Sequence, residues 1–539
     1  MLTGFTPWPE ELAERYRREG YWRGEVFGDL LRDQAAGEPD RTAVVTRDGK
    51  YSYGVLHAKA DRLAAGLAES GIRPGDRVVV QLPNTVDFVV VSVALFRLGA
   101  LPVYALPAHR RAEITYLCRY AEAVALVVPD RGSAVDFRTL AREVVKDCRT
   151  VRQVLVAGDA EEFTALEDVA ASPRELPGPR PEDVAFLLLS GGSTGMPKLI
   201  PRTHDDYSYQ VRATAEAMGF TQDSAYLAAL PVGHNAALGC PGVLGALRAG
   251  GRVAMAASPS PDEVFPLIAE AKATLTTLMP PVLALWLETA ELFEADLSEM
   301  VIEVGGAMLS PEVARQVPTT LGARLSHWFG MAEGILCFTR LDDPQKVAFT
   351  TQGVPLSPAD ELRVVDDAGR DVPPGQVGQL LVRGPYTIRG YYNVPEHNRD
   401  AFTSDGFLRT GDLARIAQDG RLTVTGRTKD VINRGGEKIS ASEVEGHLVG
   451  HPKVRRAVLV AVADSGLGER SCAVVVPYGD PPTLEELRVF LRERGLADFK
   501  LPDRLEVVDA LPQTGVGKID KRTVASTVAS GGQGAEDGA

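Results

Sequence analysis

Hydrophobic residues in the first third of the chain fall in short runs separated by stretches of helical length. From Arg77 the sequence reads RVVVQLP, an apolar helix-like stretch, LPVYALP, a second helix-like stretch and AVALVVPD. Short β-rich runs that alternate with helices predict βαβ units and a sheet covered on both faces. The same rhythm returns around residues 184–310. This pattern favours an α/β fold.

Two local patterns add detail to this part of the chain. The segment AVVTRDGKYSY carries a D-G turn between alternating strands, which predicts a hairpin. The longest apolar run, Phe88 to Phe96, is too short to span a bilayer and ends at Arg97, so it predicts a buried helix.

The pattern changes near residues 405–430, where short antiparallel strands punctuated by Gly and Asp are expected. A compact α+β segment follows, with a helix from about Ser442, strands in VRRAVLVAVA and SCAVVVPY, and a helix in PTLEELRVFLRERG. We predict a large N-terminal domain over 1–428, with βαβ-type sheets and a β-rich subdomain. A small α+β domain over 429–528 and a disordered tail over 529–539 complete the chain.

Composition narrows the possible partners. A chain of 539 residues is long enough for at least two domains, and its net charge of −14 argues against nucleic acid as a partner. The five cysteines form no CxxC pair, and their odd number argues against a disulfide framework. The N-terminus lacks the apolar stretch of a signal peptide. We therefore expect a cytoplasmic protein with no membrane partner.

A glycine-rich loop follows the β-like run AFLLL in LLLSGGSTGMPKLIPRTH. Glycines let the backbone approach an anion closely, while hydroxyl groups and a lysine add donors and charge. A Walker loop needs a glycine directly before the lysine and a serine or threonine directly after it. Pro197 precedes Lys198, and Ile519 follows Lys518, so neither segment is a Walker loop. The loop predicts a phosphate cradle, with a flexible surface turn as the alternative. Its candidate residues are Gly191, Gly192, Ser193, Thr194, Gly195 and Lys198.

Five motifs in order, SGGSTGMPK, FGMAEG, LRTGD, GRTKDVINRGGEKIS and PQTGVGK, resemble those of the adenylate-forming superfamily. This superfamily contains acyl-CoA synthetases, non-ribosomal peptide adenylation domains and firefly-type luciferases. GFTPWPEELAERYR, SGGSTG, LPVGHN and RGPYTIRGYY make the chain most similar to stand-alone aryl-acid ligases, which adenylate 2,3-dihydroxybenzoate or salicylate for siderophores. The resemblance implies ATP and Mg²⁺ as cofactors, an aryl-AMP intermediate and a thiol acceptor.

The resemblance also assigns roles around the nucleotide. Lys518 would be catalytic, reaching the substrate carboxylate and the α-phosphate, whereas a solvated lysine beside a turn is the alternative. Asp412 and Arg427 would hold the ribose hydroxyls, and Glu333 would hold Mg²⁺. The same likeness makes two glycines, Gly305 and Gly306, the wall beside adenine and the acyl group.

In LPVGHNAALGCPG, His234 resembles a catalytic group near the carboxylate and phosphates, and Asn235 resembles a residue beside the ring's 2-hydroxyl. A satisfied core histidine and a capping asparagine are the alternatives. By the same resemblance, Cys240 and Leu336 occupy positions at which dihydroxybenzoate enzymes carry serine and valine. A thiol pairs poorly with a 3-hydroxyl group, so salicylate or a substituted salicylate is the expected substrate.

Lys429 and Asp430 resemble a hinge on which a mobile small domain swings between adenylation and thiolation. Gly435, Gly436 and Lys438 would line the tunnel for a phosphopantetheine thiol, with a glycine-rich strand connection as the alternative.

The acceptor is expected to be a separate aryl carrier protein or coenzyme A. A basic cluster could receive an acidic carrier, although a solvated helix face is the alternative; it comprises Arg492, Arg494, Lys500 and Arg504. Rival functions are a salicylate-CoA or other aryl-CoA ligase, a 2,3-dihydroxybenzoate-AMP ligase, and a non-catalytic nucleotide-binding or luciferase-like oxidative protein.

Overall fold

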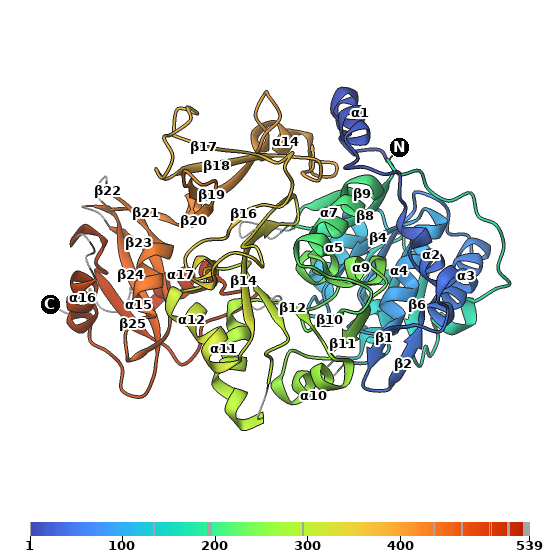
Figure 1. The fold of residues 1–539 in the computed structure, drawn as a ribbon, viewed down its shortest axis with the longest axis horizontal. Coiled ribbons are helices and arrows are strands. Elements are labelled where there is room, and N and C mark those ends of the chain that lie inside the picture. Colours follow the sequence, from blue (N-terminus) through green and yellow to red (C-terminus); the bar gives the residue numbers. More distant parts are fainter. Residues whose placement is uncertain are drawn as a thin grey trace.

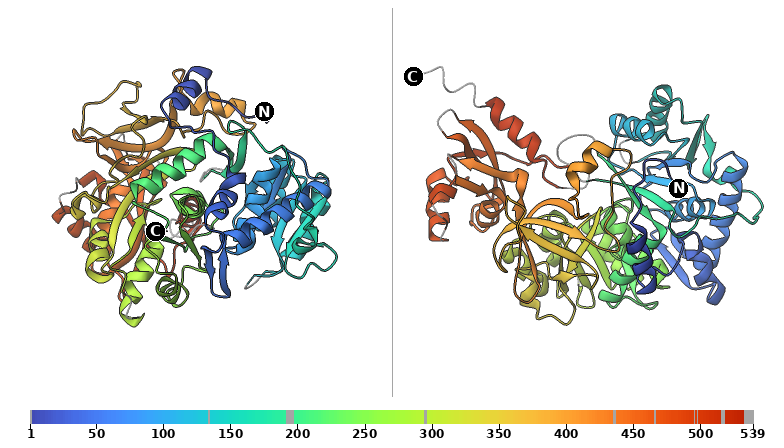
Figure 2. Two further views of the ribbon diagram at one scale, coloured as in Figure 1. Left: turned by 45° about the vertical axis from the view of Figure 1, so that its right-hand side comes forward. Right: turned by 90° about the horizontal axis from the view of Figure 1, so that it is seen from above.

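A computed structural model describes residues 2–132, 135–190, 197–293, 296–434, 437–464, 467–494, 496, 498–514 and 518–531. Two large sheets with their helices, coloured blue to yellow in Figure 1, make up one end of the molecule. A small orange-to-red domain lies at the other end, and a gold β-sheet stands above the junction. The view from above in Figure 2 shows the same separation. The predicted combination of a large α/β part and a small α+β part is confirmed.

The first large sheet has the strand order β7-β6-β5-β3-β4-β8-β9 within the described residues. Its pairs are parallel except for β8 with β9, as expected for strands joined by helices. The strands are β3 (Arg77–Val80), β4 (Leu101–Tyr104), β5 (Ala125–Pro129), β6 (Gln153–Ala157), β7 (Thr164–Ala165), β8 (Val184–Leu189) and β9 (Leu199–Thr203). The helices that accompany it are α3 (Tyr53–Glu69), α4 (Val86–Leu98), α5 (Arg111–Tyr120), α6 (Phe137–Asp147) and α7 (His204–Ala217).

The second large sheet has the order β16-β15-β14-β13-β12-β10-β11-β1-β2, and β1 with β2 forms the predicted hairpin. Its strands are β1 (Thr42–Thr46), β2 (Gly49–Ser52), β10 (Ala225–Ala228), β11 (Arg252–Met255), β12 (Leu275–Leu278), β13 (Val301–Val304), β14 (Arg324–Met331), β15 (Gly334–Phe338) and β16 (Val354–Pro355). Its helices are α8 (Asn235–Gly239), α9 (Gly242–Arg248), α10 (Pro261–Ala271), α11 (Pro280–Thr289), α12 (Pro311–Thr320) and α13 (Gln345–Ala348). Two further helices precede the sheets, α1 (Glu10–Arg18) and α2 (Leu30–Gly37).

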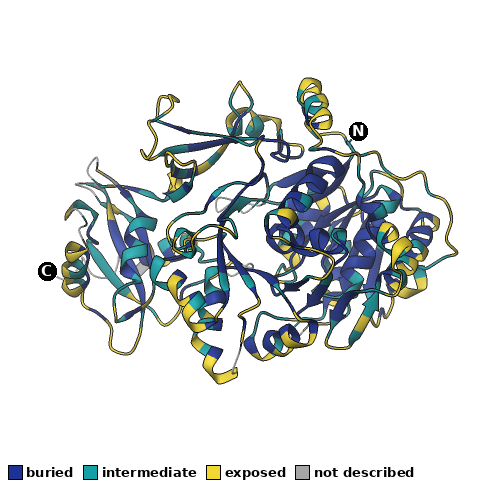
Figure 3. Cartoon of the chain, viewed as in Figure 1, coloured by how far each residue is buried: buried dark blue, intermediate teal, exposed yellow. Residues whose placement is uncertain are grey.

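Strand residues alternate between separate cores, which explains the nearly continuous apolar runs of the sequence. Val78 and Val80 face the core shared by the two sheets, whereas Val79 packs beneath α5 and α6. In the second sheet, Ile302 and Val304 pack with α10–α12 on the outer face. Figure 3 shows these buried strands in dark blue, with exposed residues on outer helices such as α10 and α16 (Leu484–Glu493). The predicted buried helix is α4.

A four-stranded antiparallel sheet supplies the predicted β-rich subdomain. Its strands are β17 (Glu361–Val365), β18 (Gly378–Arg383), β19 (Leu408–Ile416) and β20 (Leu422–Arg427), and α14 (Pro395–Ala401) lies between β18 and β19 in the chain. A short helical turn, Thr428–Asp430, then leads into the small domain. The other short 3₁₀ turns are Phe27–Asp29, Leu166–Val169, Ala290–Phe293 and Asp498–Lys500.

The small domain places helices on both faces of one sheet. Its strands are β21 (Val431–Arg434), β22 (Glu437–Ser440), β23 (Val454–Asp464), β24 (Gly468–Pro477) and β25 (Arg504–Val507). Helices α15 (Ala441–Leu448) and α16 cover one face, and α17 (Lys521–Gly531) covers the other. Because Val524 and Val528 pack on the sheet at helical spacing, α17 extends to Gly531, past the expected domain end at 528. Residues 532–539 lie outside the described residues.

None of the helices in the described part of the chain combines the length and apolar character needed to cross a membrane.

Candidate active site

Asp412 and Arg427 meet across the β19–β20 pair. They are register partners, and Arg427 Nε donates to Asp412 Oδ1 at 3.1 Å. The Asp412 side chain is buried and Arg427 is 53% exposed, so the arginine borders open space. Burial raises the pKa of Asp412, and the guanidinium opposes that rise. The two residues predicted to hold a ribose are therefore together, with one carboxylate oxygen engaged.

Lys518 approaches this pair from the small domain. Its carbonyl accepts from Thr514 N at 2.7 Å, and Gln513 pairs with Ile519, which fixes the backbone that carries the lysine. Burial and the charge of Arg427 lower the pKa of Lys518 to about 8, while the carboxylates of Asp412 and Glu333 oppose the shift. Motifs far apart in the sequence thus place their charges around one point.

Glu333 occupies the turn between β14 and β15. Tyr391 Oη donates to Glu333 Oε1 at 2.9 Å, and the Glu333 carbonyl accepts from Ile388 N at 2.8 Å. The side chain is buried, and this burial raises its pKa. Within the described residues, no group of three or more His, Cys, Asp or Glu side chains could hold a metal alone. A single carboxylate fits Mg²⁺ bound mainly through substrate phosphates and water.

His234 caps the N-terminus of α8, where its Nδ1 accepts from Ala236 N at 3.3 Å. Burial and, to a smaller extent, the charge of Lys518 lower the pKa of His234 to about 3. The imidazole is consequently neutral at physiological pH and close to the lysine. His234 thus has a backbone partner, as the core-histidine alternative requires, and it is also close to Lys518. The capping residue of α8 is His234, so the alternative that Asn235 is a capping residue is wrong.

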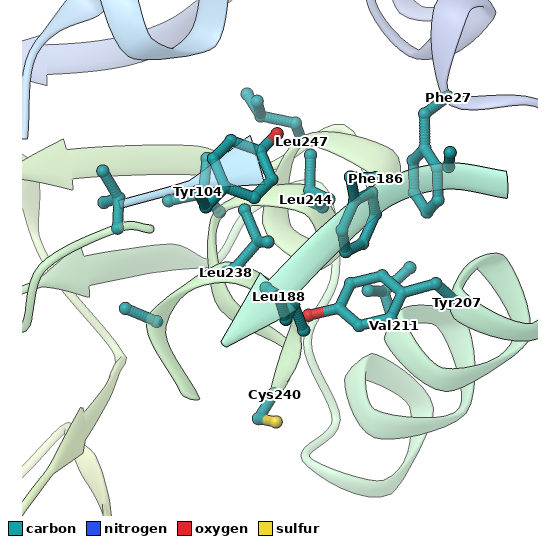
Figure 4. Close-up of a cluster of buried hydrophobic side chains, with 14 of the residues drawn as sticks. Phe27, Tyr104, Phe186, Leu188, Tyr207, Val211, Leu238, Cys240, Leu244 and Leu247 are labelled. Carbon is teal, nitrogen blue, oxygen red and sulfur yellow. The ribbon is translucent and has the colours of Figure 1, made fainter. Parts of the chain in front are cut away.

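Asn235 and Cys240 lie on the same short segment and contact each other. Asn235 Oδ1 accepts from Tyr207 Oη at 2.8 Å, and Asn235 Nδ2 lies 3.8 Å from Cys240 Sγ. Figure 4 shows Cys240 at the edge of the cluster formed by Phe186, Leu188 and Tyr207. Burial raises the pKa of the Cys240 thiol, so the group is a neutral, weak hydrogen-bonding partner.

The other predicted pocket residues lie on the second sheet. Leu336 is fully buried on β15, and its N–H donates to Tyr386 Oη at 3.0 Å. At Gly305 a Cβ atom would lie 2.3 Å from the carbonyl oxygen of Trp328. Gly306 has φ +74°, and its Cβ would lie 2.6 Å from Met279 Sδ. Close approach to the Trp328 backbone therefore favours glycine at position 305, and the positive φ favours it at position 306, while their role as a wall beside adenine and the acyl group stays a prediction.

Arg202 is a buried residue that the sequence reasoning missed. Its guanidinium pairs with Asp206 at 2.7 Å, and Nη2 donates to Gln210 Oε1 at 2.9 Å. Nη1 donates to the carbonyl of Ala332, next to Glu333, at 2.9 Å. A charged residue inside the apolar run of β9 was the available signal, since buried arginines are paired.

Gln210 continues this network to the ring pocket. Its Nε2 donates to the carbonyl of Gly239 at 2.9 Å and lies 3.8 Å from Cys240 Sγ. Arg202 therefore links the turn that carries Glu333 to the segment that carries Cys240.

The predicted phosphate cradle falls mostly on residues that the structure does not describe, namely Gly191, Gly192, Ser193, Thr194 and Gly195. Lys198, at its end, is described. Its N–H donates to Ser190 Oγ at 2.9 Å, and its ammonium lies 5.9 Å from the ring centre of Tyr391. Because Tyr391 also binds Glu333, Lys198 lies near the metal-binding candidate.

The predicted hinge is the helical turn Thr428–Asp430, which includes Lys429. Asp430 accepts from Lys521 Nζ at 3.3 Å, and Lys521 also pairs with Glu445 at 2.8 Å. Asp430 is thereby tied to the small domain. Gly435, Gly436 and the side chain of Lys438 lie outside the described part.

Among the described residues, two ion pairs join the small domain to the large one in the arrangement that brings Lys518 to the site. Arg494 pairs with Glu312 at 3.2 Å, and Arg455 pairs with Glu288 at 2.9 Å. Both are partly exposed, so each contributes about 1 kcal/mol or less. Such weak contacts suit a domain arrangement that can change.

Each cation of the proposed carrier-binding cluster has an acidic neighbour. Arg492 pairs with Asp498 at 2.9 Å, and Lys500 pairs with Glu443 at 2.7 Å. Arg494 pairs with Glu312, as noted, and Arg504 lies 2.9 Å from Glu506. The surface is therefore of mixed charge, which favours the solvated-face alternative over a basic docking patch.

Comparison with known proteins adds independent findings. The chain is 55% identical over 529 residues to "2,3-dihydroxybenzoate-AMP ligase" of Bacillus subtilis (strain 168), covering 98% of each chain. It is 48% identical to "Salicylyl-CoA synthase / salicylate adenylyltransferase" of Streptomyces sp, covering 97% of this chain and 98% of that one. It is 46% identical to "Salicyl-AMP ligase / salicyl-S-ArCP synthetase" of Mycobacterium tuberculosis, covering 97% and 94%.

Among solved structures, apo MbtA of Mycobacterium smegmatis superimposes with a TM-score of 0.76 at 48% identity, covering 97% of this chain and 98% of that one. Residues 443–518 match the family described as AMP-binding enzyme C-terminal domain, which covers Lys518. Residues 31–392 match the family described as AMP-binding enzyme, and they include His234, Asn235 and Glu333. The chain therefore belongs to the AMP-binding enzyme family.

Proposed function

We propose that this protein is an ATP-dependent aryl-acid ligase. It activates an aryl carboxylic acid as aryl-AMP and passes the aryl group to a phosphopantetheine thiol, in the biosynthesis of a siderophore or related non-ribosomal peptide. The observation that carries the proposal is the convergence of Lys518, Asp412, Arg427, Glu333 and His234 on one site. Aryl-acid ligase activity is also what the names of the relatives reported above describe.

In the first half-reaction a carboxylate oxygen attacks the α-phosphorus of ATP, and the bond to the β-phosphate breaks to release pyrophosphate. Negative charge develops at the α-phosphate, so a fixed cation lowers the barrier. Lys518 supplies that cation, because its charge acts on both Asp412 and His234. The neutral His234 adds a donor or acceptor without adding repulsion to Lys518.

Nucleotide binding is assigned to the neighbouring groups. Asp412 and Arg427 hold the ribose diol, since a carboxylate accepts from both hydroxyls. Glu333 would hold Mg²⁺, which supplies positive charge to the phosphates. Gly305 and Gly306 leave room for the adenine and the acyl group, while the loop that ends at Lys198 cradles phosphate.

In the second half-reaction the thiol sulfur attacks the aryl carbonyl, AMP leaves and a thioester forms. The small domain turns at Lys429 and Asp430, which removes Lys518 from the site and brings Lys438 and its neighbours toward the thiol. The weak interdomain pairs Arg494–Glu312 and Arg455–Glu288 support this proposal, since they can be exchanged at small cost.

Salicylate or a substituted salicylate is the proposed substrate. Asn235 serves the 2-hydroxyl region, and Cys240 and Leu336 line the ring. The neutral, buried Cys240 thiol offers little to a 3-hydroxyl group, which argues against 2,3-dihydroxybenzoate as the preferred acid.

A separate aryl carrier protein is the proposed acceptor, with coenzyme A as the second candidate. The names of the relatives include both chemistries, an ArCP synthetase and a CoA synthase. We place the enzyme in the cytoplasm, and the five buried free cysteines support a reducing location.

The test is pyrophosphate exchange driven by a panel of substituted benzoates, followed by thioester formation with coenzyme A and with a carrier protein. We expect exchange with salicylates, and AMP release that is faster with the carrier than with coenzyme A. Absence of exchange with every aryl acid would overturn the proposal.

A further inference from the structure

Glu303 is a fully buried carboxyl group on β13 that the reaction described above does not use. Its strand neighbours Ile302 and Val304 pack on the outer face of the second sheet. Because side chains alternate along a strand, Glu303 points to the opposite face, toward the core that contains Cys240 and Leu336. The carboxyl group therefore lies on the side of the ring pocket.

Hydrogen bonds connect Glu303 with Cys240. Thr277 is the register partner of Glu303 on β12, and its hydroxyl lies 2.7 Å from Glu303 Oε2. The same hydroxyl lies 3.2 Å from the carbonyl oxygen of Cys240. One side chain thus joins the carboxyl group to the segment that carries the ring-pocket cysteine.

Two polar atoms in this region lack partners among the described residues. They are Glu303 Oε1 and the hydroxyl oxygen of Tyr226, and both side chains are fully buried. Tyr226 projects from β10 into the same core, where its hydroxyl is close to Thr277, without a hydrogen bond of good geometry, and interacts electrostatically with Glu303 and Cys240. Buried polar groups are normally paired, so these two atoms, beside the proposed ring pocket, can each take a further hydrogen-bond partner.

The open oxygen of Glu303 is an acceptor in either protonation state. Burial raises the pKa of Glu303 to about 8, so the neutral form is the main one at pH 7. In that form Oε2–H donates to Thr277, which donates to the Cys240 carbonyl. In the ionised form Thr277 donates to Oε2 instead. Oε1 needs a donor in both cases.

We propose that Glu303, Thr277 and Tyr226 form a polar recess that binds a hydrogen-bond-donating substituent on the ring of the aryl acid. A hydroxyl or amino group would donate to Glu303 Oε1, and a hydroxyl group would also accept from Tyr226. This inference rests on the proposed function and narrows its substrate to salicylates with a second donor group, held by Glu303 at a place that Cys240 cannot serve.

The test compares salicylates that carry hydroxyl, amino or methyl at the same ring position, taken in turn at positions 4 and 5. We expect wild-type kcat/KM in pyrophosphate exchange to favour hydroxyl or amino over methyl by roughly tenfold or more at one position. Glu303→Leu should abolish or reverse this ratio, and Glu303→Gln, which keeps an acceptor, should retain most of it.

Two further variants keep the test decisive if Glu303→Leu does not fold. Thr277→Val, which fits a strand, removes the hydroxyl that orients the carboxyl group and should reduce the ratio several-fold. Ser326→Ala is the matched control, because Ser326 pairs in register with Glu303 but donates to the carbonyl of Thr339 at 3.1 Å. Its ratio should stay at the wild-type value.

The outcomes separate the two proposals. If salicylate drives exchange but methyl is accepted as well as hydroxyl or amino at every position, the recess holds only buried water and the inference is wrong. A ratio that survives both Glu303→Leu and Thr277→Val would also overturn it. If no aryl acid drives exchange, the proposed function itself fails.

Discussion

Arg427 donates to one carboxylate oxygen of Asp412, and it does so from the facing position on the neighbouring antiparallel strand. The contact uses Oδ1, while the carboxylate as a whole can accept several hydrogen bonds. The arginine thus fixes the orientation of the carboxylate. Nucleotide binding should depend on this orientation as well as on the negative charge.

Asp412→Ala should weaken nucleotide binding. Loss of hydrogen bonds from a charged acceptor costs about 1.5–3 kcal/mol, so the KM for ATP should rise roughly 10- to 100-fold. Asp419→Ala is the control, because Asp419 lies on the turn of the same hairpin and pairs with Arg421 away from the site. Equal ATP KM values for the two variants would contradict the ribose assignment.

Lys518→Ala should reduce aryl-AMP formation by about 10²- to 10³-fold, the usual cost of removing one preorganised charge-stabilising group. Pyrophosphate exchange measures this loss, and circular dichroism checks that the fold persists. Lys521→Ala, three residues away, is a control that removes a lysine paired with Asp430 and Glu445. Near-normal exchange in the Lys518 variant would refute its role.

The pH dependence of adenylation should follow the protonation state of Lys518. Its pKa is lowered to about 8, so the lysine is charged below that pH and loses its proton above it. In the free enzyme, kcat/KM for exchange should therefore fall as pH rises through about 8. Glu303 also titrates near pH 8, and Glu303→Gln distinguishes the two groups. An alkaline limb that vanishes in Glu303→Gln would assign it to the glutamate.

Cys240→Ser should raise the turnover of 2,3-dihydroxybenzoate relative to salicylate. A serine hydroxyl can pair with the 3-hydroxyl group, and relief of an unpaired buried hydroxyl is worth about 1–3 kcal/mol. Exchange assays with both acids give the ratio. Cys337→Ser changes another buried thiol, next to Leu336 on β15, and controls for the general effect of a new hydroxyl group. The pocket assignment fails if the two serine variants give the same ratio.

Lys429→Pro should stop thioester formation while sparing adenylation. Proline restricts the backbone dihedral angles about which the small domain would turn. Lys429→Ala changes the side chain without restricting the backbone, so it separates the two effects. The measurements are pyrophosphate exchange and transfer of the aryl group to a thiol. Equal loss of both activities in Lys429→Pro would argue against a hinge.

Local patterns were sufficient to predict much of the fold. Alternation at residues 43–53 predicted the β1–β2 hairpin, and the apolar run from Phe88 predicted α4. The hairpin and the helix depend on residues that are neighbours in the sequence, so the local pattern is enough to predict them. The end of α17 was missed because packing of Val528 on the sheet, a tertiary contact, extends that helix.

The site was predictable only in part. Motif order identified Asp412, Arg427 and Lys518, yet nothing local placed Lys518 beside His234, since they are separated by a domain boundary. The sequence did not predict the roles of Arg202 and Glu303, because these roles depend on hydrogen-bond partners far away in the sequence. Arg202 binds the carbonyl of Ala332, and Glu303 binds Thr277. A buried charge inside an apolar strand is the signal that such partners exist.

The Arg202 network constrains how this enzyme's substrate range can be altered. Its guanidinium ties the Glu333 turn to Gln210, and Gln210 holds the backbone beside Cys240. A library that varies Gln210 to enlarge the proposed pocket would therefore also disturb the turn that carries Glu333, the proposed Mg²⁺ ligand. A library that varies Cys240, Leu336 and Glu303 but keeps Arg202 and Gln210 should change which acids are accepted without disturbing the Glu333 turn.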